Sequence, residues 1–361
     1  MRKFAFDMHN ENAFSNTLIH WYLANCRDLP WRHTRDPYLI WVSEIILQQT
    51  QVAQGLDYYR RFVAQFPDAQ TLATTPIDQV LKVWQGLGYY SRARHLHASA
   101  QQIVQKFGGK FPKNHTDVLS LAGVGRYTAA AICSFAYGQP YAAVDGNGYR
   151  VLARYFGLDA PTDTAAGQRQ FFQLANEVLS PTQPALHNQA LMEFGALHCT
   201  PTAPHCADCP LAASCDALAT NRVSTLPRKQ GKTQVRNRYF NYIFAVSDGK
   251  TLLHQRTAGD IWQGLYEFPL VETAEDFAIE QILASDDFLK IIGNQPFTLV
   301  YTTPVRKHIL THQRIFARCL SIEIPKIAAT NTDFIVVPTV NLADYPMSRL
   351  MEKLLSDLTE K

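Results

Sequence analysis

Four of the seven cysteines lie within one short stretch, "CTPTAPHCADCPLAASC". A zinc ribbon usually has two Cys-x2-Cys knuckles separated by a longer insert, and this stretch contains only one such knuckle. A compact loop of four thiolates can instead hold a [4Fe–4S] cluster, with one sulfur bound to each iron. The spacing therefore favours a [4Fe–4S] cluster over zinc and over unligated thiols. The four candidate ligands are Cys199, Cys206, Cys209 and Cys215.

Two acidic residues stand in otherwise uncharged surroundings. Glu44 is the only charged residue within 37–56, and Asp145 is the only one within 127–149. A carboxyl group among apolar side chains has a raised pKa and can act as a general acid. A second carboxylate that stays ionised can stabilise a sugar cation, as glycosidic bond cleavage requires. The alternatives are a solvated helix face for Glu44 and a turn or capping position for Asp145.

The stretch "DVLSLAGVGRYTAAAICSFAYG" predicts two helices joined by a tight turn at Gly123, Val124 and Gly125. Amides of such a turn and of the next helical turn point outward together, which suits a DNA phosphate. A plain helical hairpin is the alternative. Basic residues near the turn favour DNA, namely Lys106, Lys110, Lys113, Arg126, Arg150 and Arg154.

The elements that must position these residues fall into two halves. Residues 14–198 have the apolar rhythm of helices throughout, as in "QRQFFQLANEVL". We predict a helical domain at 1–216 that includes the cysteine loop, an interdomain linker at 217–236, and a second domain at 237–361.

The linker region is basic, and the pattern of the sequence changes from helices to strands after it. Residues 217–238 contain no acid, so they form either a solvated tether or a segment aligned along phosphates. "RYFNYIFAVSDGKTLLHQR" predicts two strands around an Asp-Gly turn, and a helix is expected from about Pro346. The basic residues are Arg222, Arg228, Lys229, Lys232, Arg236 and Arg238.

Composition limits the class of protein. Hydrophobic content of 47% and charged content of 18% are typical of a globular chain, and the net charge of +3 says little about partners. The sequence has no apolar run of membrane-span length and no apolar signal segment at its start. We therefore expect no membrane association and a cytoplasmic location, where thiols are kept reduced.

The sequence resembles the adenine DNA glycosylase (MutY) family over nearly its whole length. The segments that carry the resemblance include "LPWRHTRDPYLIWVSEIILQQTQV", "GLGYYSRARHLHASA", "LAGVGRYTAAAI", "VDGNGYRVLARYFG", "MEFGALHCTPTAPHCADCPLAASC", "IWQGLYEFP" and "KHILTHQRI". The fold class that the resemblance implies is α+β multidomain: an all-α helix-hairpin-helix glycosylase domain with a [4Fe–4S] loop, followed by an α/β Nudix-like domain. The four cysteines would then hold the cluster beside the DNA.

The resemblance also implies an activity. Members of this family remove adenine mispaired with 8-oxoguanine, or with guanine, in double-stranded DNA and leave an abasic site. The adenine is flipped out of the duplex into a pocket before the bond is cleaved. The protein would be a monofunctional glycosylase that acts as a monomer and associates with the nucleoid.

Individual residues match the family's functional positions. Glu44 matches the acid that protonates the leaving adenine, and Asp145 matches the carboxylate that stabilises the sugar cation. Asn147 and Tyr127 match residues that position the nucleotide and the acid. Those expected to line the adenine side, to enter the duplex, or to read 8-oxoguanine are Trp31, Arg32, Gln49, Thr50, Leu87, Tyr89, Thr311 and His312.

Three rival functions make different demands on the sequence. An endonuclease III-like glycosylase with lyase activity needs a Schiff-base lysine, but Tyr127 occupies that position and residues 114–228 contain no lysine. A Nudix hydrolase needs a glutamate-rich metal-binding helix, which "TAEDFAIEQILASDDF" lacks. The presence of both Glu44 and Asp145 argues against a non-catalytic protein that only binds lesions.

Overall fold

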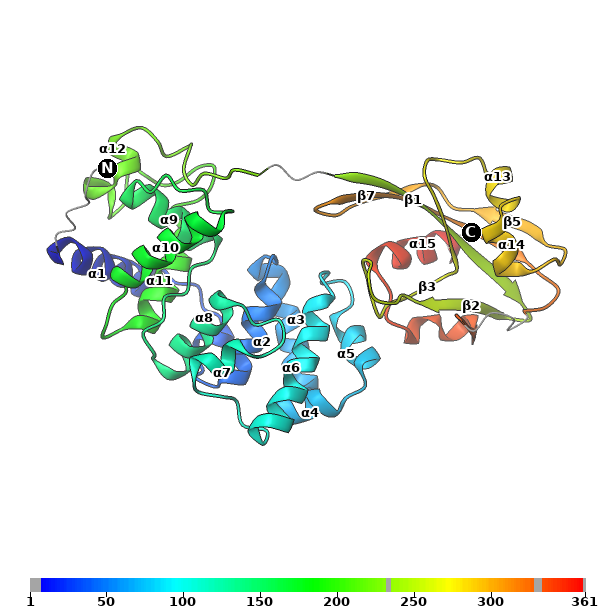
Figure 1. The fold of residues 1–361 in the computed structure, drawn as a ribbon, viewed down its shortest axis with the longest axis horizontal. Helices are drawn as coiled ribbons and strands as arrows, with labels where there is room; N and C mark the ends of the chain where they lie inside the picture. The colour runs from blue at the N-terminus through cyan, green and yellow to red at the C-terminus, as the bar shows by residue number, and fades with distance from the viewer. Residues whose placement is uncertain (1–7, 232–234, 328–332, 360–361) are drawn as a thin grey trace. The chain divides into compact units, whose positions relative to one another are not determined.

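The computed structural model describes residues 8–231, 235–327 and 333–359 (Figure 1). The chain divides into two compact units. Unit 1 comprises Met1–Ala73 and Ala98–Gly231, and unit 2 comprises Thr74–His97 and Lys232–Lys361. A segment of the helical half of the sequence therefore belongs to the second unit. No helix among the described residues is long and apolar enough to cross a membrane.

Unit 1 is helical, as its apolar periodicity predicts. One of its hydrophobic cores lies between α1, α9, α10 and α11, around Phe14, Phe171 and Phe194. Helix α2 begins at Pro37, and the Asp36 side chain accepts a hydrogen bond from the Tyr38 amide at its first turn. The elements are α1 (Met8–Asn25), η1 (Pro30–Arg32), α2 (Pro37–Leu47), α3 (Val52–Gln65), α4 (Ala69–Thr74), α6 (Ser91–Phe107, shared with unit 2), α7 (His115–Leu119), α8 (Arg126–Tyr137), α9 (Gly146–Phe156), α10 (Ala165–Glu177), α11 (Pro184–Leu197), η2 (Ala212–Ser214) and α12 (Asp216–Ala219).

The predicted helical hairpin is formed by α7 and α8. Gly123 has a φ of +70°, which favours glycine, whereas Gly125 has a φ of −87° and caps the start of α8. Both glycines are exposed, while Val124 between them is buried. The turn thus presents backbone at the surface and anchors itself through one apolar side chain.

Unit 2 is built on one eight-stranded sheet with the path β3-β2-β1-β7-β5. Strands β1 and β7 pair in parallel, and β1 and β2 form the predicted hairpin, with positive φ at Asp248 and Gly249. The elements are α5 (Ile77–Trp84), β1 (Arg236–Ser247), β2 (Lys250–Gln255), β3 (Tyr266–Glu267), β4 (Leu270–Thr273), α13 (Ile279–Leu283), α14 (Asp286–Ile292), β5 (Thr298–Thr302), β6 (Arg306–Ile309), β7 (Gln313–Glu323), β8 (Phe334–Pro338), η3 (Thr339–Asp344) and α15 (Arg349–Thr359).

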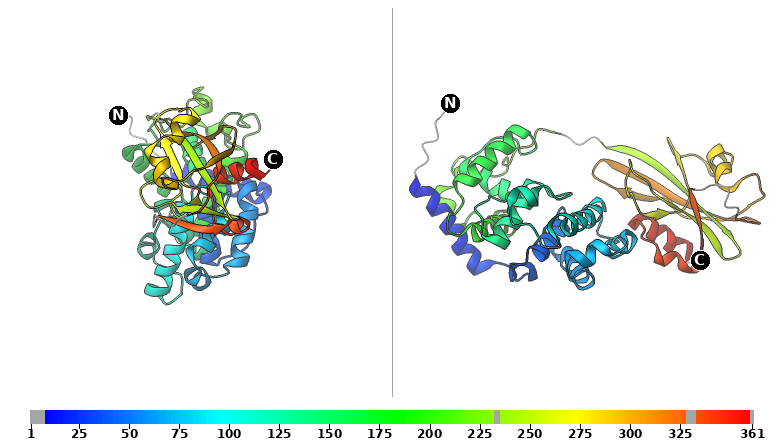
Figure 2. Two further views of the ribbon diagram at one scale, coloured as in Figure 1. Left: turned by 90° about the vertical axis from the view of Figure 1, so that its right-hand side faces the viewer. Right: turned by 60° about the horizontal axis from the view of Figure 1, so that its bottom comes forward.

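Helices cover both faces of this sheet (Figure 2). Leu350, Met351 and Leu354 of α15 pack against one face, together with residues of β1 and β7. Residues of α13 and α14 pack against the other face, around Phe288 and Ile322. The alternating side chains of β1 and β7 supply both layers, as the two-residue period of a strand requires.

Most of the predicted linker is packed rather than extended. Residues 217–231 belong to unit 1, where Leu226 is buried and the amides of Gln230 and Gly231 donate to the carboxylate of Asp163. Arg222 pairs with Asp216 and Arg228 with Asp159, and Arg238 lies buried in the sheet. Each of these three arginines pairs with an acid, and the alignment of the basic segment along phosphates stays a prediction. Lys232 lies outside the described residues.

Candidate active site

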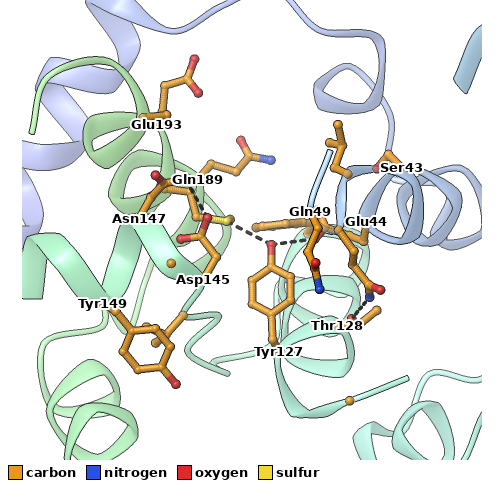
Figure 3. Close-up of a pocket in the computed structure, with 18 of the residues that line it drawn as sticks. Ser43, Glu44, Gln49, Tyr127, Thr128, Asp145, Asn147, Tyr149, Gln189 and Glu193 are labelled. Carbon is orange, nitrogen blue, oxygen red and sulfur yellow. Dashed lines mark hydrogen bonds between the residues drawn. The ribbon is translucent and has the colours of Figure 1, made fainter. Parts of the chain in front are cut away.

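A cleft of about 1030 Å³ opens in unit 1. Its walls come from the end of α2, the start of α8, the start of α9 and the inner face of α11 (Figure 3). It gathers most of the residues that the sequence analysis singled out in this unit, namely Trp31, Arg32, Glu44, Gln49, Thr50, Gly123, Gly125, Tyr127, Asp145 and Asn147. The four remaining duplex-reading candidates lie in unit 2.

Glu44 is buried although it sits on the wall of the cleft. Helix α2 is apolar around almost its whole circumference, so Glu44 is carried into the interior and is only 8% exposed. Its Oε2 accepts a hydrogen bond of 2.7 Å from the Tyr127 hydroxyl. Burial raises the pKa of Glu44 to about 7, helped by the nearby charge of Asp145 and opposed by the Tyr127 hydrogen bond. The solvated-face interpretation of Glu44 is therefore wrong.

Asp145 is both the capping residue of α9 and a wall of the cleft. Its Oδ1 accepts a hydrogen bond of 2.7 Å from the Gly148 amide, and its Oδ2 accepts one of 2.8 Å from Asn147 Nδ2. Burial raises the pKa of Asp145, while these donors and the charge of Arg150 oppose the rise. Capping and a chemical role are thus compatible, because the cap holds the carboxylate in place.

Tyr127 lies between the two acids (Figure 3). Its hydroxyl donates to Glu44 and lies 3.2 Å from the sulfur of Met192. Burial, together with the neighbouring carboxyl groups of Glu44 and Asp145, raises the pKa of Tyr127 far above its ordinary value. Tyr127 is therefore a neutral donor that orients Glu44.

A third acid of the cleft, Glu193, was missed by the sequence analysis. It is 1% exposed and accepts hydrogen bonds from Arg27 and Arg32. Burial alone would raise its pKa, but these arginines outweigh that effect and lower the pKa to about 2. Glu193 is the only charged residue within 178–207, so the criterion that selected Glu44 and Asp145 would also have found it.

A chain of hydrogen bonds links Asp145 to the cysteine loop. Arg150 Nη2 donates to Asn147 Oδ1 at 2.8 Å, and Arg150 Nε donates to the carbonyl oxygen of Cys199 at 2.7 Å. Arg154 is also buried and donates to carbonyl groups of the same loop. The expectation that Arg150 and Arg154 mark a DNA surface is wrong, because both side chains are used to hold the loop.

The four candidate ligands line one cavity of about 30 Å³, together with Arg154 and His198. Among the described residues, no three His, Cys, Asp or Glu side chains are grouped as ligands for one metal ion. Two polar atoms beside Cys199, His198 Nε2 and Thr200 Oγ1, are buried and have no hydrogen-bond partner. Buried polar atoms are rarely left in this state, so the region beside the loop has hydrogen-bonding capacity that a bound group would use.

The duplex-reading candidates of unit 2 include one close pair. Tyr89 is 47% exposed, and its hydroxyl lies 3.2 Å from that of Thr311, although the two residues are 222 positions apart. Thr311 and His312 form the turn between β6 and β7. Leu87 is buried, as an ordinary core residue would be.

Comparisons with known proteins agree with this arrangement. The model of the HhH-GPD superfamily base excision DNA repair protein matches residues 42–174, and the NUDIX domain model matches residues 241–357. This order confirms the predicted helix-hairpin-helix glycosylase domain followed by a Nudix-like domain. A solved thermostable thymine-DNA glycosylase is 31% identical, with a TM-score of 0.55, covering 59% of this chain and 100% of its own.

Curated relatives extend the likeness along the chain. The adenine DNA glycosylase of Mus musculus is 40% identical over 233 residues, which are 61% of this chain and 45% of the mouse protein. That of Buchnera aphidicola subsp. Baizongia pistaciae is 33% identical over 332 residues, and the match covers 88% of each chain. With both of its domains matched in order and most of a relative covered, this chain belongs to the adenine DNA glycosylase family of base excision DNA repair proteins.

Proposed function

We propose that this protein hydrolyses the N-glycosidic bond of adenine mispaired with 8-oxoguanine or guanine in double-stranded DNA. The observation that carries the proposal is the state of Glu44, a buried carboxyl group in an open cleft whose pKa is about 7. Such a group is about half protonated at neutral pH and can give its proton to a leaving base. The names of the curated relatives support adenine as that base.

The roles of the two acids follow from their different partners. Glu44 accepts one hydrogen bond, and in our proposal it delivers its proton to a ring nitrogen of adenine. The electron pair of the C–N bond then leaves with the base. Asp145 accepts two hydrogen bonds, which favour its charged form, and it stabilises the positive charge that develops on the sugar. Water adds to the sugar and completes the hydrolysis.

The test is base release from defined duplexes. The purified protein should release adenine opposite 8-oxoguanine, and more slowly adenine opposite guanine. Alkali then cleaves the strand at each abasic site, so that the sites can be counted. An A:T duplex of the same sequence is the control and should stay intact. Alkali-labile sites in all three duplexes, or in none, would overturn the proposed substrate.

We propose that the enzyme is monofunctional. Tyr127 occupies the position where a lyase carries its lysine, and none of the described residues that line the cleft is a lysine. Borohydride added during turnover should therefore trap no enzyme–DNA adduct. An endonuclease III-type enzyme run in parallel is the positive control, and stoichiometric trapping on this protein would favour the bifunctional alternative.

We propose that Cys199, Cys206, Cys209 and Cys215 hold a [4Fe–4S] cluster. The cysteine spacing and the one cavity that all four cysteines line support this proposal. When bound, the cluster would cross-link four points of the loop and could also exchange an electron. Protein purified without oxygen should contain about four irons per chain. Stoichiometric zinc without iron would contradict the assignment, and Cys199→Ser should weaken folding or DNA binding before it alters the chemical step.

We further propose how the rest of the DNA is held. The exposed amides of Gly123 and Gly125 would contact a phosphate, while Gln49, Thr50, Tyr89 and Thr311 would read the base opposite adenine. The protein would act on nucleoid DNA as a monomer. Changing Thr311 to Ala should reduce the preference for 8-oxoguanine over guanine by less than about a hundredfold, because one good base contact contributes about 1–3 kcal/mol and Gln49 and Thr50 would still read the base.

A further inference from the structure

The segment "IWQGLYEFP" has no role in the chemistry of the cleft, yet it makes specific contacts within unit 2. Arg94 Nη1 donates to the carbonyl oxygen of Gln263 at 2.7 Å, and the Tyr266 hydroxyl donates to Asp78 Oδ2 at 3.0 Å. Gly264 has a φ of +84°, and a Cβ there would lie 3.2 Å from Leu81 Cδ1. Glycine at this position therefore allows both the turn and the close approach to α5.

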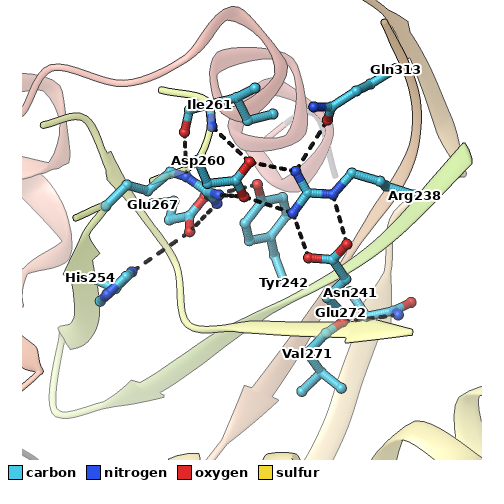
Figure 4. Close-up of polar contacts among 11 residues, drawn as sticks. Arg238, Asn241, Tyr242, His254, Asp260, Ile261, Glu267, Val271, Glu272 and Gln313 are labelled. Atoms are coloured by element: carbon cyan, nitrogen blue, oxygen red, sulfur yellow. Dashed lines mark hydrogen bonds and ion pairs between the residues drawn. The ribbon is translucent and has the colours of Figure 1, made fainter. Parts of the chain in front are cut away.

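A buried network of charges holds this segment in shape (Figure 4). Arg256 pairs with Glu267 and Asp260, and Asp260 pairs in turn with Arg238. Arg256 Nε also donates to the carbonyl oxygen of Ile261, and Asp260 Oδ1 accepts from the Ile261 amide. The network thus fixes the start of the segment from inside the sheet.

A second group of contacts joins the same helix, α5, to the start of α15. Gln85 Oε1 accepts from the Met347 amide at 3.1 Å, and Gln85 Nε2 donates to Glu352 Oε1 at 2.5 Å. Lys82 Nζ donates to the carbonyl oxygen of Tyr345, and the Tyr90 hydroxyl donates to that of Met347. Lys82 and Gln85 precede Tyr89 in the sequence, whereas Arg94 follows it.

The residues before and after Tyr89 in the sequence are therefore both anchored. Gln85 and Arg94 are anchored to the Nudix-like domain, and the exposed Tyr89 between them meets Thr311. We infer that residues 261–266 and the start of α15 form a clamp, by which the Nudix-like domain grips residues 74–97. This clamp, rather than the linker, keeps Tyr89 and Thr311 together. Its effect on lesion preference rests on the proposed function, but the docking itself does not.

Docking can be tested on a nicked chain. A protease site placed within residues 231–235 allows the linker to be cut after folding. The two fragments should elute together in gel filtration, because the clamp joins residues 74–97 to the rest of unit 2. Fragments that separate in the otherwise unchanged protein would overturn the clamp.

A charge introduced within the clamp offers a sharper test. Gln85→Glu places a carboxylate against Glu352, and together with Arg94→Ala it should weaken fragment association at least about tenfold. Glu352→Gln should restore association to the Gln85→Glu variant, because an amide again faces a carboxylate. Gln105→Glu, an exposed change on α6 outside the clamp, is the matched control. Dissociation that is no greater than in this control would contradict the inference.

The effect on lesion preference is read from uncut protein under single-turnover conditions. Gln85→Glu should lower the ratio of the A:8-oxoguanine rate to the A:G rate by about tenfold, leave the A:G rate within about twofold, and regain the ratio with Glu352→Gln. An unchanged ratio in a variant whose nicked fragments separate would refute the positioning of Tyr89. If the unchanged enzyme releases no adenine, the proposed function has failed, while the fragment test still decides the docking.

Discussion

Two tyrosine–glutamate pairs, one in each unit, have nearly the same geometry and different surroundings. In unit 1 the Tyr127 hydroxyl donates to Glu44 at 2.7 Å, and in unit 2 the Tyr242 hydroxyl donates to Glu267 at 3.0 Å (Figures 3 and 4). Both glutamates are buried. Glu267, however, also accepts two hydrogen bonds from Arg256, whereas no arginine among the described residues donates a hydrogen bond to Glu44.

The difference shows that a hydrogen-bonded arginine distinguishes an acid with a structural role from an acid that can take part in a reaction. A buried carboxylate beside an arginine stays charged and becomes part of the framework. Without the arginine, burial favours the neutral acid, so Glu44 can carry a proton to a substrate. Glu193 makes the same point within the cleft, because Arg27 and Arg32 lower its pKa to about 2.

The largest expected effect of this difference is on catalysis. Glu44→Gln keeps the size and the buried position of the side chain but cannot deliver a proton. Adenine release in single-turnover assays should fall by about 10² to 10⁴-fold, the usual contribution of general acid catalysis. Binding of the mismatched duplex, measured by gel shift, should be retained. A near-normal rate would mean that Glu44 is only a buried polar residue.

Removing the arginine from the structural pair should affect folding instead. Arg256→Met removes the main ionic partner of the buried Glu267 side chain, and breaking a buried ion pair in this way costs about 3–5 kcal/mol. The transition of unit 2 in thermal unfolding should therefore move to lower temperature. Arg228→Met, which breaks an exposed pair with Asp159, is the matched control and should cost less than about 1 kcal/mol. Equal effects of the two changes would contradict a structural role for the Arg256 pair.

The pH dependence of the rate should identify Glu44 as the acid. Because its pKa is about 7 and the protonated form is active, the single-turnover rate should fall about fiftyfold between pH 7 and pH 9. Tyr127→Phe removes a hydrogen bond that lowers this pKa, so the decline should begin at higher pH. A rate that stays constant up to pH 9 would exclude Glu44 as the proton donor.

The smallest expected effect is on stability. The substitution of Glu44 that reduces activity should make the folded protein more stable. The pKa of Glu44 is raised from 4.5 in the unfolded chain to about 7 in the folded protein. Below pH 4.5 both states hold the proton and no penalty exists; the penalty develops between pH 4.5 and pH 7 and is complete above it. Glu44→Gln should therefore stabilise unit 1 at pH 8, by on the order of 1–3 kcal/mol, and give no such gain at pH 4. Denaturant unfolding at the two pH values measures the gain, and a gain of equal size at both would refute its origin in the carboxyl group.

Several features of this protein could be predicted from local sequence. The Asp248–Gly249 hairpin and the Gly123 turn follow from backbone conformations that few residues adopt. The isolation of Glu44 and Asp145 among apolar residues pointed to the candidate cleft, because an unpartnered acid in an apolar segment is carried inside with it. The cysteine spacing likewise pointed to one loop.

Other features were decided only by tertiary contacts. The sequence showed a lone Glu193 but not that Arg27, 166 positions away, would keep it charged. Arg150 and Arg154 were predicted to favour DNA binding, but in the structure both side chains donate hydrogen bonds to carbonyl groups of the cysteine loop. Residues 74–97 read as part of the helical half, yet they pack into the second unit. Local patterns determine the backbone conformation of a segment and which of its faces are apolar. The charge state of a buried group, and the segment against which a surface packs, depend on side chains brought together from distant parts of the chain.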